Sequence, residues 1–118
     1  MNPTEELLTQ LTHIAQRLGI PSAVGVFPQS PAPDTFVVFT PLSETFEFHA
    51  DNTPQVDTSE VRLSLYTTHN YLDIARRLTQ AVLDAGLTVA ARRYVGFEAD
   101  TGYHHWATDI QHWTRTHD

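Results

Sequence analysis

The chain has 118 residues, which is the size of one domain with a modest hydrophobic core. Its 14 acidic and 7 basic residues give a net charge of −7, the wrong sign for a protein that binds nucleic acid through its phosphates. The absence of cysteine excludes disulfides and thiolate chemistry, and no apolar run approaches the ~20 residues of a membrane span. We therefore expect one soluble domain over residues 1–118, without specific nucleic-acid binding and without membrane contact.

The N-terminal segment is predicted to form a helix. Asn2 can cap it, Pro3 fits the first helical position, and Gly19 is a natural stop. Apolar residues recur between them at helical spacing: Leu7, Leu8, Leu11, Ile14, Ala15 and Leu18. This helix is expected to bury one stripe against the rest of the domain.

Two strands are predicted next, over residues 22–27 and 35–40, separated by a proline-rich turn. Pro41 should break the second strand or mark a sheet edge, because proline donates no backbone hydrogen bond. The segment from Thr45 to Val56 begins with alternating aromatic and polar residues and then becomes polar. We interpret it as an extended arm or as the rising half of a loose hairpin.

The second half of the chain reads strand, helix, strand, strand. Residues 61–67 alternate between apolar and polar, as in a sheet with one covered face. A helix follows, with Asn70 as its cap and Gly86 as its stop, and strands are predicted over residues 87–94 and 103–113. The order α-β-β-(β)-β-α-β-β predicts an α+β fold, with both helices on one face of a mainly antiparallel sheet.

The loop between the last two strands has the composition of a hairpin turn. Asp100 and Thr101 can hydrogen-bond to the local backbone, and Gly102 tolerates the positive φ that such a turn requires. Thr101 and Gly102 are therefore predicted to be structural. Phe97 and Tyr103 flank the loop, where a cross-strand aromatic pair would fix the register.

Residues that could carry chemistry are not arranged for it. His104 and His105 are adjacent in a predicted strand and so point to opposite faces, while His112 lies eight residues from His104. No serine stands in a Gly-x-Ser-x-Gly motif, and no phosphate-binding loop is present. The sequence predicts no enzyme, no metal and no cofactor.

The order of elements, together with the hairpin, resembles the tail-completion or tail-terminator proteins of long-tailed phages and prophages. The similarity includes a strand-to-helix joint over residues 65–71, and after it an acidic turn that is followed by an aromatic residue. The matching residues are Asp100, Thr101, Gly102, Tyr103, His104 and Trp106.

This resemblance implies a structural virion protein that forms a ring of six copies. The ring would stop growth of the tail tube and join the tail to the head connector, after assembly in the cytoplasm of a bacterial host. Its partners would be itself, the tail tube protein and the connector. A head-closure or minor capsid protein is an alternative, and a small ligand-binding or regulatory α+β module is another; an enzyme is the third choice.

Large aromatic residues are numerous for a sheet covered by two helices, and a contiguous exposed set of them would mark an interface. The residues predicted to form such an interface lie in two places, three on the segment from Thr45 to Val56 and three around the last hairpin. The predicted oligomer or tail interface comprises Phe46, Phe48, Asp51, Phe97, Asp100 and Tyr103.

Overall fold

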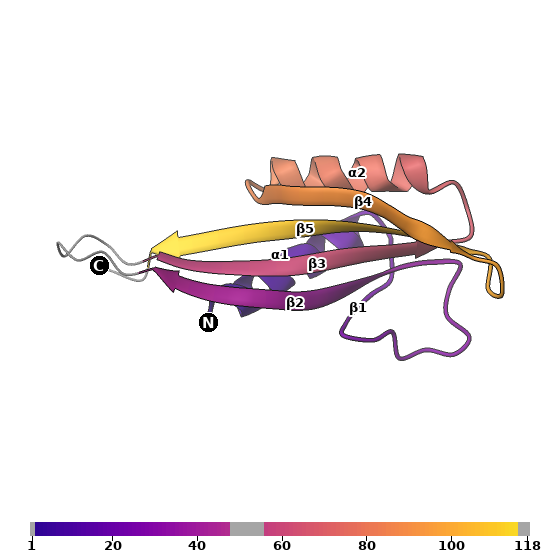
Figure 1. Cartoon of the computed structure of the whole chain (residues 1–118), viewed down its shortest axis with the longest axis horizontal. Coiled ribbons are helices and arrows are strands. Elements are labelled where there is room, and N and C mark those ends of the chain that lie inside the picture. Colours follow the sequence, from indigo (N-terminus) through magenta and orange to yellow (C-terminus); the bar gives the residue numbers. More distant parts are fainter. Residues whose placement is uncertain (1, 48–55, 116–118) are drawn as a thin grey trace.

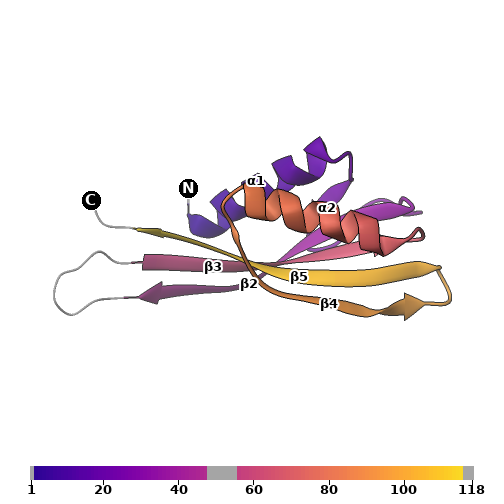
Figure 2. The same cartoon turned by 90° about the horizontal axis from the view of Figure 1, so that it is seen from above.

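The structure is a computed structural model that describes residues 2–47 and 56–115, with side chains for 2–44 and 56–114. The elements in chain order are α1 (Pro3–Arg17), β1 (Ser22–Val24), β2 (Thr35–Glu47), β3 (Val56–Thr67), α2 (Tyr71–Asp84), β4 (Thr88–Glu98) and β5 (Tyr103–Arg115). The long strands run side by side along the molecule (Figure 1), and both helices lie on the same side of them (Figure 2).

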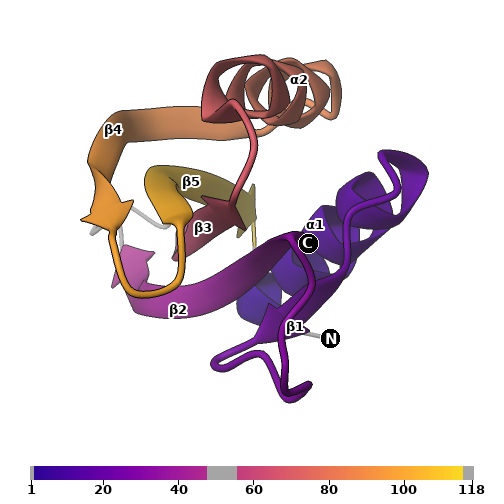
Figure 3. The ribbon, with the colours of Figure 1, turned by 90° about the vertical axis from the view of Figure 1, so that its right-hand side faces the viewer.

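The strands form one five-stranded sheet in the order β1-β2-β3-β5-β4. Only the short β1 pairs in parallel, with β2, and the other neighbours are antiparallel. The predicted α+β class and element order are confirmed. Viewed along the strands, the sheet is curled, with β2 and β4 toward its two sides (Figure 3).

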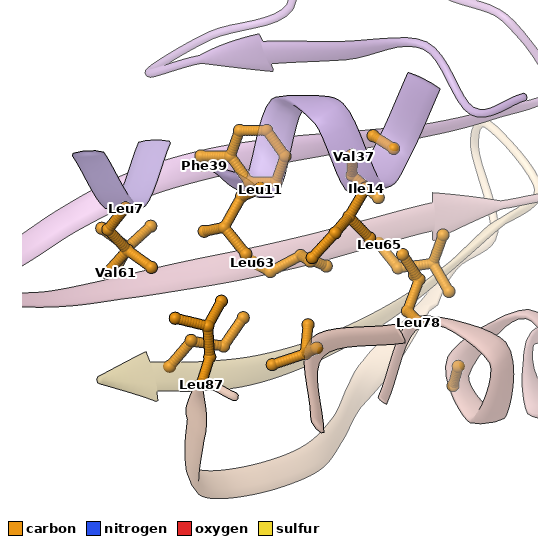
Figure 4. Close-up of a cluster of buried hydrophobic side chains, with 14 of the residues drawn as sticks. Leu7, Leu11, Ile14, Val37, Phe39, Val61, Leu63, Leu65, Leu78 and Leu87 are labelled. Atoms are coloured by element: carbon orange, nitrogen blue, oxygen red, sulfur yellow. The ribbon is translucent and has the colours of Figure 1, made fainter. Parts of the chain in front are cut away.

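The core fills the space between the sheet and the helices. Val61, Leu63 and Leu65 of the central strand β3 are fully buried on this side, which confirms the predicted alternation. Figure 4 shows them among the apolar side chains of α1, α2 and the neighbouring strands. The largest buried partners are Leu7, Leu11, Ile14, Phe39, Leu78, Val82 and Ile110.

Both helices begin where the sequence predicts. The Asn2 side chain accepts a hydrogen bond from the Glu5 amide at 2.8 Å, and the Glu5 carboxylate accepts one from the Asn2 amide, which completes a capping box. Asn70 accepts from the Leu72 amide at 3.0 Å, and Gly86 follows α2 with φ +81°. Within the described residues, neither helix is long and apolar enough to cross a membrane.

The second strand is longer than predicted, and Pro41 marks an edge of the sheet, which is one of its two predicted roles. Pro41 does not break β2: the pairing with β3 shifts between Pro41 and Ser43, as in a β-bulge, and then continues to the pair Glu47–Val56. Of the two interpretations of the segment from Thr45 to Val56, the extended arm is wrong at the described ends, and the hairpin is confirmed there by the antiparallel pairs up to Glu47–Val56. Proline is tolerated because at a sheet edge its missing N–H costs no ladder bond.

The other strand boundaries also moved. β1 ends at Val24, before the predicted end, whereas β3 begins at Val56, five residues before the predicted start. β4 and β5 extend to Glu98 and Arg115. The extensions share one cause, since each added segment has a partner strand along its length that satisfies its backbone groups.

Candidate assembly surfaces

The turn between β4 and β5 is held by its own residues. Gly102 has φ +81°, and its amide donates to the Glu98 carbonyl at 2.8 Å. The Thr101 hydroxyl donates to the Glu98 carboxylate at 3.0 Å and accepts from the Tyr103 amide at 3.4 Å. Asp100 is exposed at the tip. Thr101 and Gly102 thus make local structural contacts. The Asp100 carboxylate makes no hydrogen bond to the described part of the chain.

Phe97 and Tyr103 are not a cross-strand pair. Phe97 lies opposite His104, and Tyr103 lies opposite Glu98, so the two rings project from opposite faces of the hairpin. The prediction was wrong because the turn occupies four residues and closes on the pair Glu98–Tyr103. Phe97 remains 56% exposed, with its ring centroid 4.9 Å from that of His104.

Tyr103 belongs to an aromatic cluster on the sheet face that the helices leave uncovered. Its ring meets Phe36 edge-on at 5.5 Å, and its hydroxyl donates to the Pro33 carbonyl at 2.7 Å. The hairpin is thereby fastened to the proline-rich segment some 70 residues earlier. The members of the cluster are Phe27, Phe36, Tyr66, Tyr103 and His105. Sequence reasoning missed this contact, because no local pattern signals it.

His105 serves in this cluster as an aromatic side chain. Its ring stacks on Tyr66 at 4.3 Å, and its buried Nε2 has no hydrogen-bond partner among the described residues. Burial lowers the pKa of His105 and raises the pKa of Tyr66, so both side chains are neutral at pH 7. This pairing fills space on the sheet and offers no group poised for proton transfer.

The same sheet face carries an ion pair between two neighbouring strands, Arg62 to Asp109. Arg62 of β3 donates to Asp109 of β5 through Nε at 2.8 Å and through Nη2 at 3.2 Å. Arg93 of β4 approaches the second carboxylate oxygen at 4.0 Å. The hydrogen bonds from Arg62 lower the pKa of Asp109 and raise that of Arg62. The Asp109 carboxylate therefore connects β5 with β3 and β4.

A groove of about 570 Å³ lies on the helix side, between α2 and β4. Apolar side chains at its rim are exposed, among them Leu72 at 62% and Tyr94 at 44%. Arg76 and Arg92 add positive charge to the lining, and Trp106 lies at the base. The sequence places Leu72 and Leu83 on a helix without indicating that α2 leaves its flank beside β4 open.

Both borders of the sheet carry strand edges that the described chain leaves without a partner. β1 covers β2 only from Val37 to Phe39, so the outer side of β2 is uncovered from Thr40 onward. The outer side of β4 is uncovered over its whole length from Thr88 to Glu98, and nearly all its residues are exposed. Such edges are templates for pairing with another chain.

The predicted interface residues fall into two groups at opposite ends of the strands. Phe46 lies in β2 opposite Asp57. It is near the end of the sheet where β2 and β5 end and β3 begins. Phe48 and Asp51 lie outside the described residues. Phe97 and Asp100 lie at the opposite end, beside and within the turn between β4 and β5; this turn is at the right-hand end of Figure 1. The fold therefore does not bring the two groups together within one copy.

No protein-family model and no curated protein sequence matches the chain. A solved structure shares its fold. It is a chain from the structure titled "Virion of native gene transfer agent (GTA) particle", with a TM-score of 0.59. The match covers 92% of this chain and 90% of that one at 17% identity. At this identity the likeness establishes the fold over nearly the full length of both chains.

Proposed function

We propose that the chain is a structural subunit of a virion, and that it acts as a tail terminator. Six copies form a ring on the end of the tail tube, stop growth of the tube and provide the surface to which the head connector binds. The observation that supports this most is the fold, which spans 92% of the chain and is that of a gene transfer agent virion component. The resemblance to tail terminators, carried by the strand-to-helix joint over residues 65–71 and by the hairpin residues from Asp100 to Trp106, supports the same role.

The surface properties agree with an assembly role. Each subunit of a ring contacts one neighbour on either side. Because these contacts are head-to-tail, the subunit needs two different surfaces that are complementary to each other. The two uncovered strand edges, β2 and β4, lie at opposite borders of the sheet and meet that need. The net charge of −7 also suits a passage for DNA, since a negatively charged wall does not retain the phosphates.

The proposal includes no catalytic step. The groove between α2 and β4 is open, and its polar lining is mainly arginine, tyrosine and amide or hydroxyl groups. Asp109, the described carboxylate with a clearly lowered pKa, is engaged by Arg62. These features fit docking of a protein surface better than turnover of a small substrate.

Co-expression with the tail tube protein of the same genome tests this function. Electron microscopy should show tubes of limited length with added density at one end, and tubes without this chain should grow to variable lengths. Immunogold labelling of intact particles should mark the head–tail junction. Label on tailless heads with unlabelled tubes would instead identify a head-closure protein, and label on neither structure would refute a virion role.

A further inference from the structure

We infer that copies of this chain join through their sheets: the outer edge of β4 pairs, antiparallel, with the uncovered edge of β2 in the next copy. The contact on β2 lies beyond Pro41, from Ser43 to Glu47, because β1 does not cover this part of the strand and Pro41 itself has no N–H to donate. This inference rests on the proposed function, since it states how the copies of the ring are held together. The occupant of the β4 edge is thus a second copy of the same chain.

The hydrogen-bonding pattern of the sheet shows which backbone groups of β4 are offered. The Val37 amide donates to Pro21 and the Phe39 carbonyl accepts from Gly25, so these residues of β2 turn toward β1. In antiparallel ladders the direction alternates from residue to residue. Following the register across β3 and β5, Arg92 and Tyr94 direct their backbone groups away from the sheet.

Strand direction permits the pairing without inverting a subunit. β2, β3, β5 and β4 are consecutive antiparallel neighbours, so β2 and β4 run in opposite directions. A second copy placed beside the first, in the same orientation of its sheet, brings its β2 antiparallel to β4. The curl of the sheet (Figure 3) turns each added copy relative to the last, as closure of a ring requires.

The charges beside the two edges are complementary. Arg76, Arg92 and Arg93 lie beside the edge of β4. Arg76 pairs with Asp73 and Arg93 approaches Asp109, whereas Arg92 takes part in no ion pair within the part of the chain that the structure describes. Arg92 is therefore the cation that a neighbouring copy can engage. The start of α1 and the uncovered part of β2 are acidic instead, through Glu5 and Glu44. In a chain of net charge −7, this local complementarity opposes the general repulsion between copies.

Apolar groups accompany the charges on both edges. Leu42, at the shift in β2 pairing, is 39% exposed, and Tyr94 and Val95 of β4 are similarly exposed. The groove between α2 and β4 lies directly inside the β4 edge and can receive side chains of the added copy. Backbone pairing, apolar contact and charge therefore coincide at this border.

Cysteine cross-linking tests the contact, because the natural chain has no thiol. Arg92→Cys and Glu44→Cys variants are mixed and treated with a short bifunctional thiol reagent. We expect a 1:1 heterodimer, little product from either variant alone, and a ladder of multimers from the double variant. Gln16→Cys, at an exposed position on α1, replaces Glu44→Cys as the matched control and should give only background product.

A second comparison separates backbone pairing from side-chain contact. Arg92→Ala and Arg92→Pro both remove the cation, but only proline also removes the outward N–H. We expect the association constant measured by sedimentation to be about tenfold lower for Arg92→Pro than for Arg92→Ala. Circular dichroism verifies that both variants fold. Equal association constants would refute strand pairing.

The remaining outcomes are equally decisive. Homodimers of Arg92→Cys alone would show that β4 pairs with β4, and absence of heterodimers above the Gln16→Cys background would show that the edges do not meet; either result overturns the inference. If Arg92→Pro still marks the head–tail junction in particles, the contact is wrong and the proposed function stands. If wild-type chain is missing from particles although the heterodimer forms, the function is wrong and the contact stands.

Discussion

Replacing Asp109 with asparagine should reveal how much the sheet depends on the bidentate ion pair between Arg62 and Asp109. Asparagine keeps the size of the side chain but removes its charge, and it can accept only one of the two hydrogen bonds from Arg62. Exposed ion pairs contribute about 0–1 kcal/mol and breaking buried ones costs about 3–5 kcal/mol. The Asp109 side chain is 12% exposed and that of Arg62 33%, so we expect a loss of about 2 kcal/mol.

The pH dependence of stability provides a separate check on the same pair. Arg62 holds the pKa of Asp109 below its ordinary value of 3.8, so the unfolded chain takes up this proton before the folded one. The stabilisation is complete above that ordinary value and is lost as the pH falls through the lower folded value. Asp109→Asn should lack this part of the acid destabilisation.

Urea denaturation at pH 7 and at decreasing pH measures both effects. A loss of about 2 kcal/mol corresponds to a fall of about 8 °C in melting temperature for a domain of this size. Arg62→Met and the double variant complete a mutant cycle, in which the double change should cost less than the sum of the single changes. An Asp109→Asn chain as stable as the wild type, with unchanged acid dependence, would refute the reasoning.

The remaining predictions concern the hairpin and the core, and urea denaturation measures each of them. Gly102→Val should cost about 1–2 kcal/mol because φ is +81°, whereas Gly96→Ala, at ordinary φ with open space around it, should be neutral or slightly stabilising. Tyr103→Phe should cost about 1 kcal/mol, since it removes the hydrogen bond to the proline-rich segment, and an unchanged midpoint would contradict that bond. Phe97→Ala should cost about 1 kcal/mol or less and Phe39→Ala about 3–5 kcal/mol; similar costs would contradict the burial of these two rings.

Local signals determined much of the fold, and these were predictable. The Asn2 and Asn70 caps, the helical apolar stripes and the alternation over residues 61–67 each act within a few residues. The polar start of β3 was not predictable in this way. Ser59 is fully buried, with its hydroxyl 2.7 Å from that of Thr4, and this partner lies 55 residues earlier in the chain.

The candidate surfaces divide along the same line. The turn around Gly102 could be located because its geometry is encoded by adjacent residues. The two strand edges could not be located from the sequence. A strand edge is the side of a strand that has no neighbouring strand, and this depends on the order of the strands in the whole sheet. The position of Tyr103 illustrates both cases: its place in the hairpin is local, whereas its hydrogen bond to Pro33 spans 70 residues.

The order of the sheet also constrains how the chain matures during translation. β5 is the last described strand to be synthesised, yet it lies between β3 and β4 and pairs with both along nearly its full length. Until residues 103–115 leave the ribosome, β3 lacks a neighbour on one side and β4 has none in the described sheet. Since long-range strand pairing is slow and open edges promote aggregation, the nascent chain depends on this final insertion to become a stable subunit.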